Sequence, residues 1–329
     1  MRRWIIIIGL LGTTCFSLCA DRGPAEVTLV AVQKIWDRAP HNAFTDLIRW
    51  RDRWYCVFRE GTGHAAGAGI IRVLVSEDGH RWQSCAAIGL DNVDLRDPKL
   101  SITPHGHLML VAGAAVPASR NPLTDHYSCV CFSKDGSTWT PPHKVLDSWH
   151  WLWRVTWHKG IAYGVAYVHP PGQRYRAFLA KSGDGRQWEK VTDFEPVNCT
   201  EASLAFAHDT MYCLQRRDGT PNSALLGVSH PPYLQWQWHD LGLYFGGPHL
   251  IRLPTGDWWA CGRRMAQGKP STVLARLDVQ RGTLAPALTL PSGGDTSYPG
   301  LVWHNGELWI SYYSSHEGKT SIYLARVKL

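Results

Sequence analysis

A seven-residue motif recurs along this chain and limits what the chain can fold into. The motif is Ser-x-Asp-Gly-x-x-Trp, and copies begin at Ser76, Ser133 and Ser182; a degenerate copy that keeps only the Ser and the Trp begins at Ser229. The Asp carboxylate can accept backbone N–H bonds, the Gly can adopt a positive φ and the Trp can pack between sheets, as in a turn between two strands. A period of about 50 residues is typical of one four-stranded blade of a β-propeller.

A second repeat indicates the number of blades. Each copy is a short strand, a turn and a second strand rich in apolar residues, and the first strands cover residues 44–47, 97–100, 152–155, 201–204, 247–250 and 298–301. Six copies predict an all-β, six-bladed β-propeller with four-stranded antiparallel blades over residues 21–329. We expect the last strand, 321–327, to close the ring beside the N-terminal strand, 27–32. A closed ring exposes no long strand edge, which favours a monomer.

The N-terminus has the pattern of a signal peptide. Arg2 and Arg3 precede an apolar run over residues 4–11, and small or polar residues follow up to Ala20. This order predicts a signal peptide over residues 1–20 and an exported protein, periplasmic or secreted. No apolar run is long enough for a membrane-spanning helix. The cysteines that remain are irregularly spaced, so we expect buried thiols rather than a disulfide framework.

Charge and histidine content limit the possible partners. The formal net charge is +7, and the basic residues are scattered rather than clustered, which argues against a nucleic-acid partner. The chain has 16 His, but no pair of them has the spacing of metal ligands, so neither a metal nor another cofactor is expected. A mild positive excess suits an anionic substrate.

The inner strand of each blade lines the axis of a propeller, so the first residue of each repeat is a candidate site residue. These residues are Phe44, Asp97, Leu152, Glu201, Gly247 and Tyr298. Burying a carboxylate is costly unless it is paired or used, and the acidic members therefore predict a functional site at the axis. Lys99 and His249, in the same segments, are candidate substrate-binding residues.

The second strands of three repeats end in cations near the same rim. These ends are Arg59-Glu60, Arg216-Arg217 and Arg263-Arg264. Side chains alternate along a strand, so one member of each Arg pair points inward and must find an anion there. We therefore expect Arg59, Glu60, Arg216 and Arg263 to bind a substrate.

These residues resemble the sialidase superfamily over nearly the whole chain after residue 20. The Ser-x-Asp-Gly-x-x-Trp turns resemble its Asp boxes, shortened by one residue. Ser297-Tyr298-Pro-Gly-Leu-Val resembles the family's Tyr motif, and Thr200-Glu201-Ala-Ser-Leu its Glu motif. The resemblance implies that Tyr298 is a nucleophile activated by Glu201.

The resemblance extends to three further positions. Arg216, which follows Glu201 by fifteen residues, matches one member of the family's carboxylate-binding Arg triad, and Arg263 or Arg264, ahead of Tyr298, matches the next. Asp97-Pro resembles the Asp-Pro that opens the family's second blade. An acidic terminal sugar is the substrate that the resemblance implies.

The chain also departs from the family pattern. Where sialidases begin the first blade with Phe-Arg-Ile-Pro, residues 44–47 read Phe-Thr-Asp-Leu, so the first Arg of the triad is missing. The loop that should carry the acid/base Asp reads Arg-Glu-Gly-Thr-Gly-His over residues 59–64. The substitute proton donor is then His64, our first choice, or Glu60 or Asp46, and Arg59 is the candidate to replace the missing Arg.

Three functions remain open on the sequence. The first is a retaining exo-glycosidase that uses Tyr298 and Glu201. The second is a hydrolase of neutral or uronic sugars that uses Asp46, Asp97 and Glu201 as its carboxylates. The third is a propeller that binds glycans without catalysis.

Overall fold

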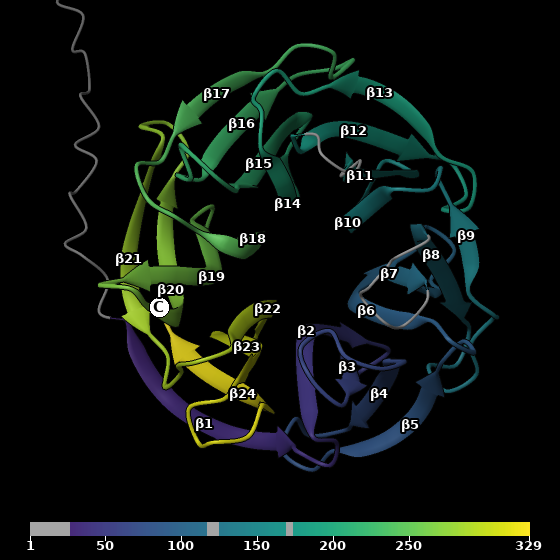
Figure 1. The fold of residues 1–329 in the computed structure, drawn as a ribbon. Coiled ribbons are helices and arrows are strands. Elements are labelled where there is room, and N and C mark those ends of the chain that lie inside the picture. Colours follow the sequence, from purple (N-terminus) through teal and green to yellow (C-terminus); the bar gives the residue numbers. More distant parts are fainter. Residues whose placement is uncertain (1–26, 117–124, 169–173) are drawn as a thin grey trace, which may run out of the picture.

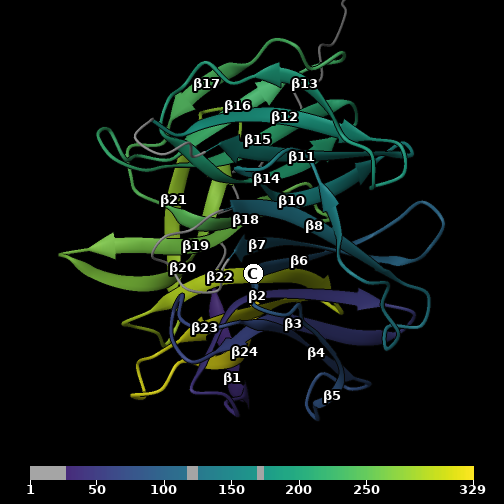
Figure 2. The same ribbon diagram turned by 45° about the vertical axis from the view of Figure 1, so that its right-hand side comes forward.

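The computed structural model describes residues 27–116, 125–168 and 174–329, and these residues form six antiparallel sheets around a central axis. Figures 1 and 2 show the sheets as the blades of a propeller, with β2, β6, β10, β14, β18 and β22 innermost. Each sheet has four strands, which confirms the predicted six-bladed β-propeller. Over the described ranges no helix has the length and apolar character needed to cross a membrane. The predicted signal peptide, 1–20, lies outside the described residues.

Five of the six blades are formed by four consecutive strands, numbered from the axis outward. Blades 1 and 2 are β2 (His41–Trp50), β3 (Arg53–Gly61), β4 (Ile70–Ser76) and β5 (Gln83–Ile88), then β6 (Asp94–Ile102), β7 (Leu108–Val116), β8 (Asp125–Ser133) and β9 (His143–Val145). Blades 3 and 4 are β10 (His150–His158), β11 (Ile161–Val168), β12 (Arg176–Ser182) and β13 (Glu189–Asp193), then β14 (Cys199–Ala207), β15 (Thr210–Arg217), β16 (Leu225–Ser229) and β17 (Gln237–Asp240). Blade 5 is β18 (Gly246–Arg252), β19 (Trp258–Ala266), β20 (Lys269–Asp278) and β21 (Thr283–Thr289).

Blade 6 joins the two ends of the chain. Its inner strands are β22 (Thr296–His304), β23 (Glu307–Ser314) and β24 (Ser321–Lys328), and its outer strand is β1 (Thr28–Trp36). β1 pairs antiparallel with β24, from Thr28 opposite Lys328 to Trp36 opposite Ile322, as Figure 1 shows for the purple and yellow strands. The predicted closure of the ring is therefore confirmed.

The apolar core is divided among the interfaces between blades. One cluster joins Val57 and Ile71 of blade 1 to Leu108 and Leu110 of blade 2, and similar clusters lie at the other five interfaces. The seven cysteines of the described ranges are unpaired and six of them are buried, as expected. Each blade is thus held mainly by its two neighbours, and this fixes the positions of the inner strands around the axis.

The repeated turns connect the third and fourth strands of blades 1 to 3. In blade 2, Asp135 accepts the backbone N–H groups of Ser137 and Thr138 at 2.8 and 2.7 Å, and Ser133 Oγ accepts that of Gly136 at 2.8 Å. A Cβ on Gly136 would lie 2.4 Å from the Tyr55 ring of blade 1. Equivalent atoms on Gly79 and Gly185 would meet Trp309 and Met109, so each turn packs on the second strand of the preceding blade. The structural role expected for these turns is confirmed.

Candidate functional site

All six inner strands carry a register irregularity at the same place. Each irregularity lies near the start of the strand, between Ala43 and Asp46, Arg96 and Lys99, Leu152 and Val155, Cys199 and Ala202, Gly246 and His249, and Ser297 and Gly300. Phe44, Asp97, Gly247 and Tyr298 have a positive φ there. A bulge turns side chains away from the plane of the pleated sheet, and six equivalent bulges aim them at a common axis. The propeller therefore presents residues from every blade at one point.

The register corrects the predicted ring at one blade, blade 3. Leu152 packs in the core cluster between blades 2 and 3, and Trp153 occupies the bulge of blade 3 instead. The Trp153 ring stands edge-on to that of Tyr298, with centroids 5.0 Å apart. In blade 4 the bulge holds both Thr200 and Glu201, so Glu201 still reaches the axis. The prediction failed by one residue in blade 3 because the sequence pattern does not show where a bulge begins.

Tyr298, Glu201 and Arg216 form the centre of the site. The Tyr298 hydroxyl donates a hydrogen bond to Glu201 Oε1, which also ion-pairs with Arg216 Nη1 at 2.7 Å. The Gly247 backbone N–H donates to Glu201 Oε2 at 2.7 Å. These contacts come from blades 4, 5 and 6, and 97 residues separate Glu201 from Tyr298. The structure thus brings together the Tyr, the Glu and the first of the two Arg residues that the motifs predicted.

Electrostatics keeps the phenol neutral and the carboxylate ionised. Burial and the nearby Glu201 carboxylate raise the pKa of Tyr298 well above its usual value. Burial acts to raise the pKa of Glu201 too, but the charge and hydrogen bond of Arg216 outweigh it, so the pKa of Glu201 is below its usual value. A buried carboxylate that accepts a hydrogen bond from a phenol is in the position of a general base.

Arg263 is the second Arg close to the Tyr298 ring. Its guanidinium is 5.4 Å from the ring centroid, and it donates to the Thr296 carbonyl at 2.8 Å and to the Tyr313 hydroxyl at 2.9 Å. Arg216 is fixed separately by Asp218, through bonds of 3.0 and 2.8 Å. Two partly buried guanidinium groups therefore lie close to Tyr298, an arrangement suited to an anionic substrate group.

Asp97 contributes a second kind of carboxyl group to the site. It lies in the bulge of blade 2, is 8 % exposed, and its Oδ1 has no hydrogen-bond partner among the described residues. Burial raises the pKa of Asp97 to about 6. The charge of Lys99 acts to lower this pKa, and the charge of Glu201 acts to raise it further. Two acidic groups of one site, Asp97 and Glu201, thus have pKa values shifted in opposite directions, as in acid/base pairs of enzymes.

Three of the predicted residues have internal partners instead. Asp46 ion-pairs with Arg154 at 3.0 Å and accepts a backbone N–H from β6, while Arg59, fully buried, ion-pairs with Asp94 at 2.6 Å. Glu60 accepts bonds from Trp36 and Arg72. These groups are saturated by the protein, so they hold strands and loops together rather than offering a free acid or cation. Their partners lie far away in the sequence, and no local motif reveals them.

Lys99 and His249 also bind the protein itself. Lys99 Nζ donates to the carbonyls of Thr45 and Pro98 and lies 4.8 Å above the Trp153 ring; burial lowers its pKa to about 8. His249 Nδ1 accepts the N–H of Leu301 at 3.0 Å, and burial lowers the pKa of this imidazole well below its usual value. Both side chains support the inner strands beside Tyr298.

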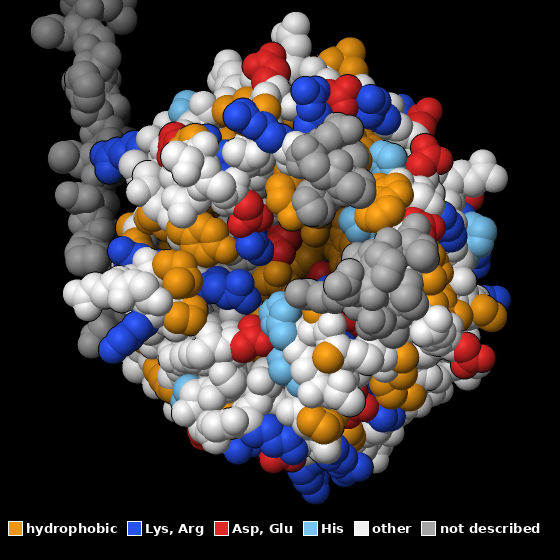
Figure 3. Space-filling view, in the orientation of Figure 1, with side chains coloured by type: hydrophobic (Ala, Val, Ile, Leu, Met, Phe, Trp, Pro, Cys, Tyr) orange, Lys and Arg blue, Asp and Glu red, His pale blue; other side chains and the backbone are white. Residues whose placement is uncertain are grey.

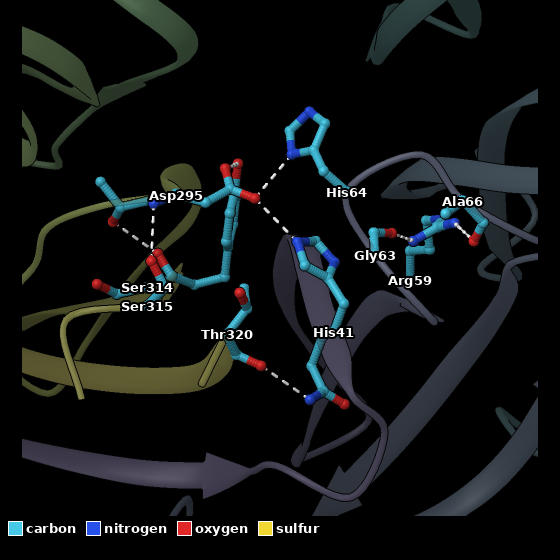
Figure 4. Close-up of polar contacts among 12 residues, drawn as sticks. His41, Arg59, Gly63, His64, Ala66, Asp295, Ser314, Ser315 and Thr320 are labelled. Atoms are coloured by element: carbon cyan, nitrogen blue, oxygen red, sulfur yellow. Dashed lines mark hydrogen bonds and ion pairs between the residues drawn. The ribbon is translucent and has the colours of Figure 1, made fainter. Parts of the chain in front are cut away.

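His64 lies at the rim of the site, in the loop between β3 and β4. Its ring stands edge-on to Phe44 at 5.0 Å, and its Nδ1 is 2.7 Å from Asp295 Oδ2 (Figure 4). His41 Nε2 lies 2.9 Å from the same oxygen, and the Tyr313 hydroxyl donates to Asp295 Oδ1 at 3.0 Å. The sequence singled out His64 but missed His41, Asp295 and Tyr313, since nothing in their spacing links them.

The face that carries these residues is hollowed at the axis. Figure 3 shows acidic, basic and apolar side chains meeting in the hollow, with histidines at its rim.

The protein is a sialidase-like six-bladed β-propeller in its fold. It is similar to a Dyadobacter fermentans protein of unknown function, with a TM-score of 0.81, 18% identity, and coverage of 93% of this chain and 100% of that one. It is also similar to Trypanosoma rangeli sialidase in complex with the inhibitor DANA, with a TM-score of 0.70 and 13% identity over 88% of this chain. The Hadza microbial sialidase Hz136 gives a TM-score of 0.68 and 14% identity, again over 88% of this chain.

The chain is shorter than the sialidases that it resembles. It covers 55% of the Trypanosoma rangeli sialidase chain and 66% of Hz136. No protein-family model and no curated protein matches the sequence. At these identities the comparisons show a common fold, and the chemistry of the site must be argued from its own residues.

Proposed function

We propose that the protein is an exo-glycoside hydrolase that removes a terminal, acidic sugar, with Tyr298 as nucleophile and Glu201 as its base. The observation that carries the proposal is the buried Tyr298–Glu201–Arg216 cluster at the axis. A neutral phenol is a poor nucleophile, and an adjacent ionised carboxylate is the group that activates it. A neutral attacking group also avoids repelling a substrate that carries its own carboxylate.

The chemical step follows from these contacts. Tyr298 Oη attacks the anomeric carbon while its proton passes to Glu201, and the bond to the leaving oxygen breaks as this oxygen takes a proton from a general acid. A water molecule then attacks the glycosyl–tyrosine intermediate and gives a proton back to the carboxylate of that acid, while Glu201 returns its proton to the phenol. The configuration at the anomeric carbon is retained by two displacements. Arg216 and Arg263 hold the substrate carboxylate beside the phenol.

We assign the proton donor to Asp97 rather than to His64, the first choice from the sequence. Asp97 lies in a bulge equivalent to that of Tyr298, and its raised pKa of about 6 keeps the carboxyl protonated in mildly acidic solution. His64 is half-exposed at the rim and is engaged by Asp295. A general acid must be protonated and must reach the leaving oxygen, and Asp97 has the better support on both counts.

The test is hydrolysis of a fluorogenic α-linked sialoside by residues 21–329 and by Tyr298→Phe. We expect turnover by the wild type and none above background in the variant. Tyr312→Phe is the matched control, because Tyr312 is a buried tyrosine of the same blade whose hydroxyl binds the Pro291 carbonyl. Intact-mass detection of a fluorinated sugar on the wild type, absent from Tyr298→Phe, gives a second readout.

The other outcomes identify the competing functions. Turnover that survives in Tyr298→Phe would contradict the Tyr mechanism and favour a carboxylate mechanism, although Asp46 is already engaged by Arg154. Saturable sugar binding by both proteins without any product would indicate a glycan-binding propeller.

We further propose that the protein is exported by residues 1–20 and acts as a monomer. Expression of the full chain should yield a mature N-terminus near residue 21, and light scattering should give the mass of one chain. A mature protein that still begins at residue 1 would contradict export, and the mass of a dimer would contradict the monomer.

A further inference from the structure

Three side chains from distant parts of the sequence converge at the rim of the axial hollow. His41 comes from β2, His64 from the β3–β4 loop and Asp295 from the residue before β22, as Figure 4 shows. His41 Nε2 and His64 Nδ1 lie 2.9 and 2.7 Å from Asp295 Oδ2, and the three atoms are within 4.8 Å of one another. Two imidazole nitrogens and a carboxylate oxygen therefore point at one place.

We propose that His41, His64 and Asp295 bind a divalent metal ion, with Zn²⁺ as the best match. Two imidazoles and one carboxylate are ligands that zinc takes in proteins, leaving a fourth position for water or another ligand. Bonds of about 2.0–2.1 Å in a tetrahedron place ligand atoms about 3.3 Å apart. The two distances to Asp295 Oδ2, 2.9 and 2.7 Å, are slightly shorter than this, and the two imidazole nitrogens lie within 4.8 Å of each other. His64 is half-exposed on a loop, so its ring can move to adjust these distances.

The carboxylate of this site is held by neighbours that orient it. Asp295 Oδ1 accepts the Tyr313 hydroxyl at 3.0 Å, and Tyr313 in turn accepts a bond from Arg263. The Asp295 backbone N–H donates to Ser315 Oγ at 2.8 Å. Outer contacts of this kind fix a metal ligand before the ion arrives. The Tyr313 hydroxyl binds both Asp295 and Arg263, and it therefore connects the proposed metal site to the proposed substrate site.

A second His–Asp pair in the protein shows what an ordinary hydrogen bond looks like. His158 and Asp209 lie 3.1 Å apart, the carboxylate is half-exposed, and its other close partner is Lys159. A lysine beside the carboxylate would repel a metal ion, and only one imidazole is present. The Asp295 cluster differs in having two imidazoles on one oxygen and a fixed second oxygen. Asp209 therefore provides the matched control.

Sequence spacing predicted no metal site. His41 and His64 are 23 residues apart and Asp295 lies on another blade, so neither spacing resembles a ligand motif. These three residues come together only when the ring closes and places blades 1 and 6 side by side.

The experiment is calorimetric titration of chelator-treated residues 21–329 with ZnCl₂, together with elemental analysis after dialysis. We expect one equivalent of zinc per chain. Asp295→Asn and His64→Gln, which keep the size of each side chain close to the original, should lower the affinity at least about 100-fold. Asp209→Asn should bind zinc like the wild type.

Two further measurements separate this proposal from a folding defect and from the proposed function. Circular dichroism and the melting temperature of each variant without metal should match those of the wild type. Tyr298→Phe should bind zinc normally even if it abolishes turnover, because Tyr298 is not a ligand. A wild type without stoichiometric zinc, or Asp295→Asn and His64→Gln variants that bind like it, would overturn the proposal and leave a hydrogen-bonded cluster only.

Discussion

Two repeated features of this propeller lie on opposite faces and have opposite characters. The turns between third and fourth strands repeat the same residues in three blades, and each Asp is satisfied by the backbone of its own turn. The bulges of the inner strands repeat the same backbone in six blades but carry different residues. Where the same residues repeat, as in the turns, their role is structural. Where the same backbone irregularity repeats with different side chains, as in the bulges, those side chains form a candidate site.

The acidic residues of the two features titrate in opposite directions. Asp135, exposed in its turn, has a pKa lowered by hydrogen bonds from the backbone at Thr138 and Ser137. Asp97, buried in its bulge, has a pKa raised to about 6 because water is excluded. The same side chain is therefore an ionised turn element on one face and, below about pH 6, a protonated acid on the other.

The largest effect expected is from the base of the site. Glu201→Gln removes the proton acceptor of Tyr298, and we expect kcat/KM to fall about 10²–10⁴-fold. Asp184→Asn, in the turn of blade 3, should leave turnover unchanged, because Asp184 binds only its own turn. A turn variant that lowers turnover as much as Glu201→Gln would break the distinction between the two faces.

The second prediction concerns pH. Glu201 must be ionised and Asp97 protonated, so kcat/KM should be highest in acid and fall as the pH rises through about 6, the raised pKa of Asp97. In Asp97→Asn this alkaline limb should disappear and turnover should be low at every pH. An alkaline limb that remains near pH 6 in the variant would assign the proton donor to another group, His64 first.

The sequence predicted features that depend on local motifs and missed those that depend on distant contacts. Tyr298, Glu201 and Arg216 were found because each lies in a short pattern, and the ring of six was found because the patterns repeat. The partners of Arg59 and Asp46 were missed, since Asp94 and Arg154 belong to other blades and reach them only after folding. Trp153 was missed because a bulge shifts the register by one residue without a sequence signal.

A smaller effect, on stability, tests the packing of the turns. Gly136 has a φ of 84° and no room for a Cβ against Tyr55, whereas Gly160 has a φ of 83° and no atom within 4 Å. Gly160→Ala should cost about 1–2 kcal/mol from backbone strain alone. Gly136→Ala should cost about 1–3 kcal/mol more, from overpacking between blades 1 and 2. Equal losses in urea unfolding would show that this turn does not pack between the blades.

The smallest effect concerns stability in acid. A carboxylate with a pKa lowered by folding stabilises the protein at any pH above its unfolded pKa, and that contribution is lost as the pH falls. Folding lowers the pKa of Asp135 from an ordinary value of 3.8, so its contribution is complete above about pH 4 and declines below it. Asp135→Asn should therefore have a lower melting temperature than the wild type at pH 6, and the difference should narrow toward pH 3.

The contribution of Asp97 to stability changes with pH in the opposite direction, because a raised pKa makes its ionised form unfavourable in the folded protein. Asp97→Asn should thus gain stability relative to the wild type as the pH rises from about 4 to about 6, with no further change above that range. Two variants that shift in the same direction with pH would contradict the contrast between turn and bulge.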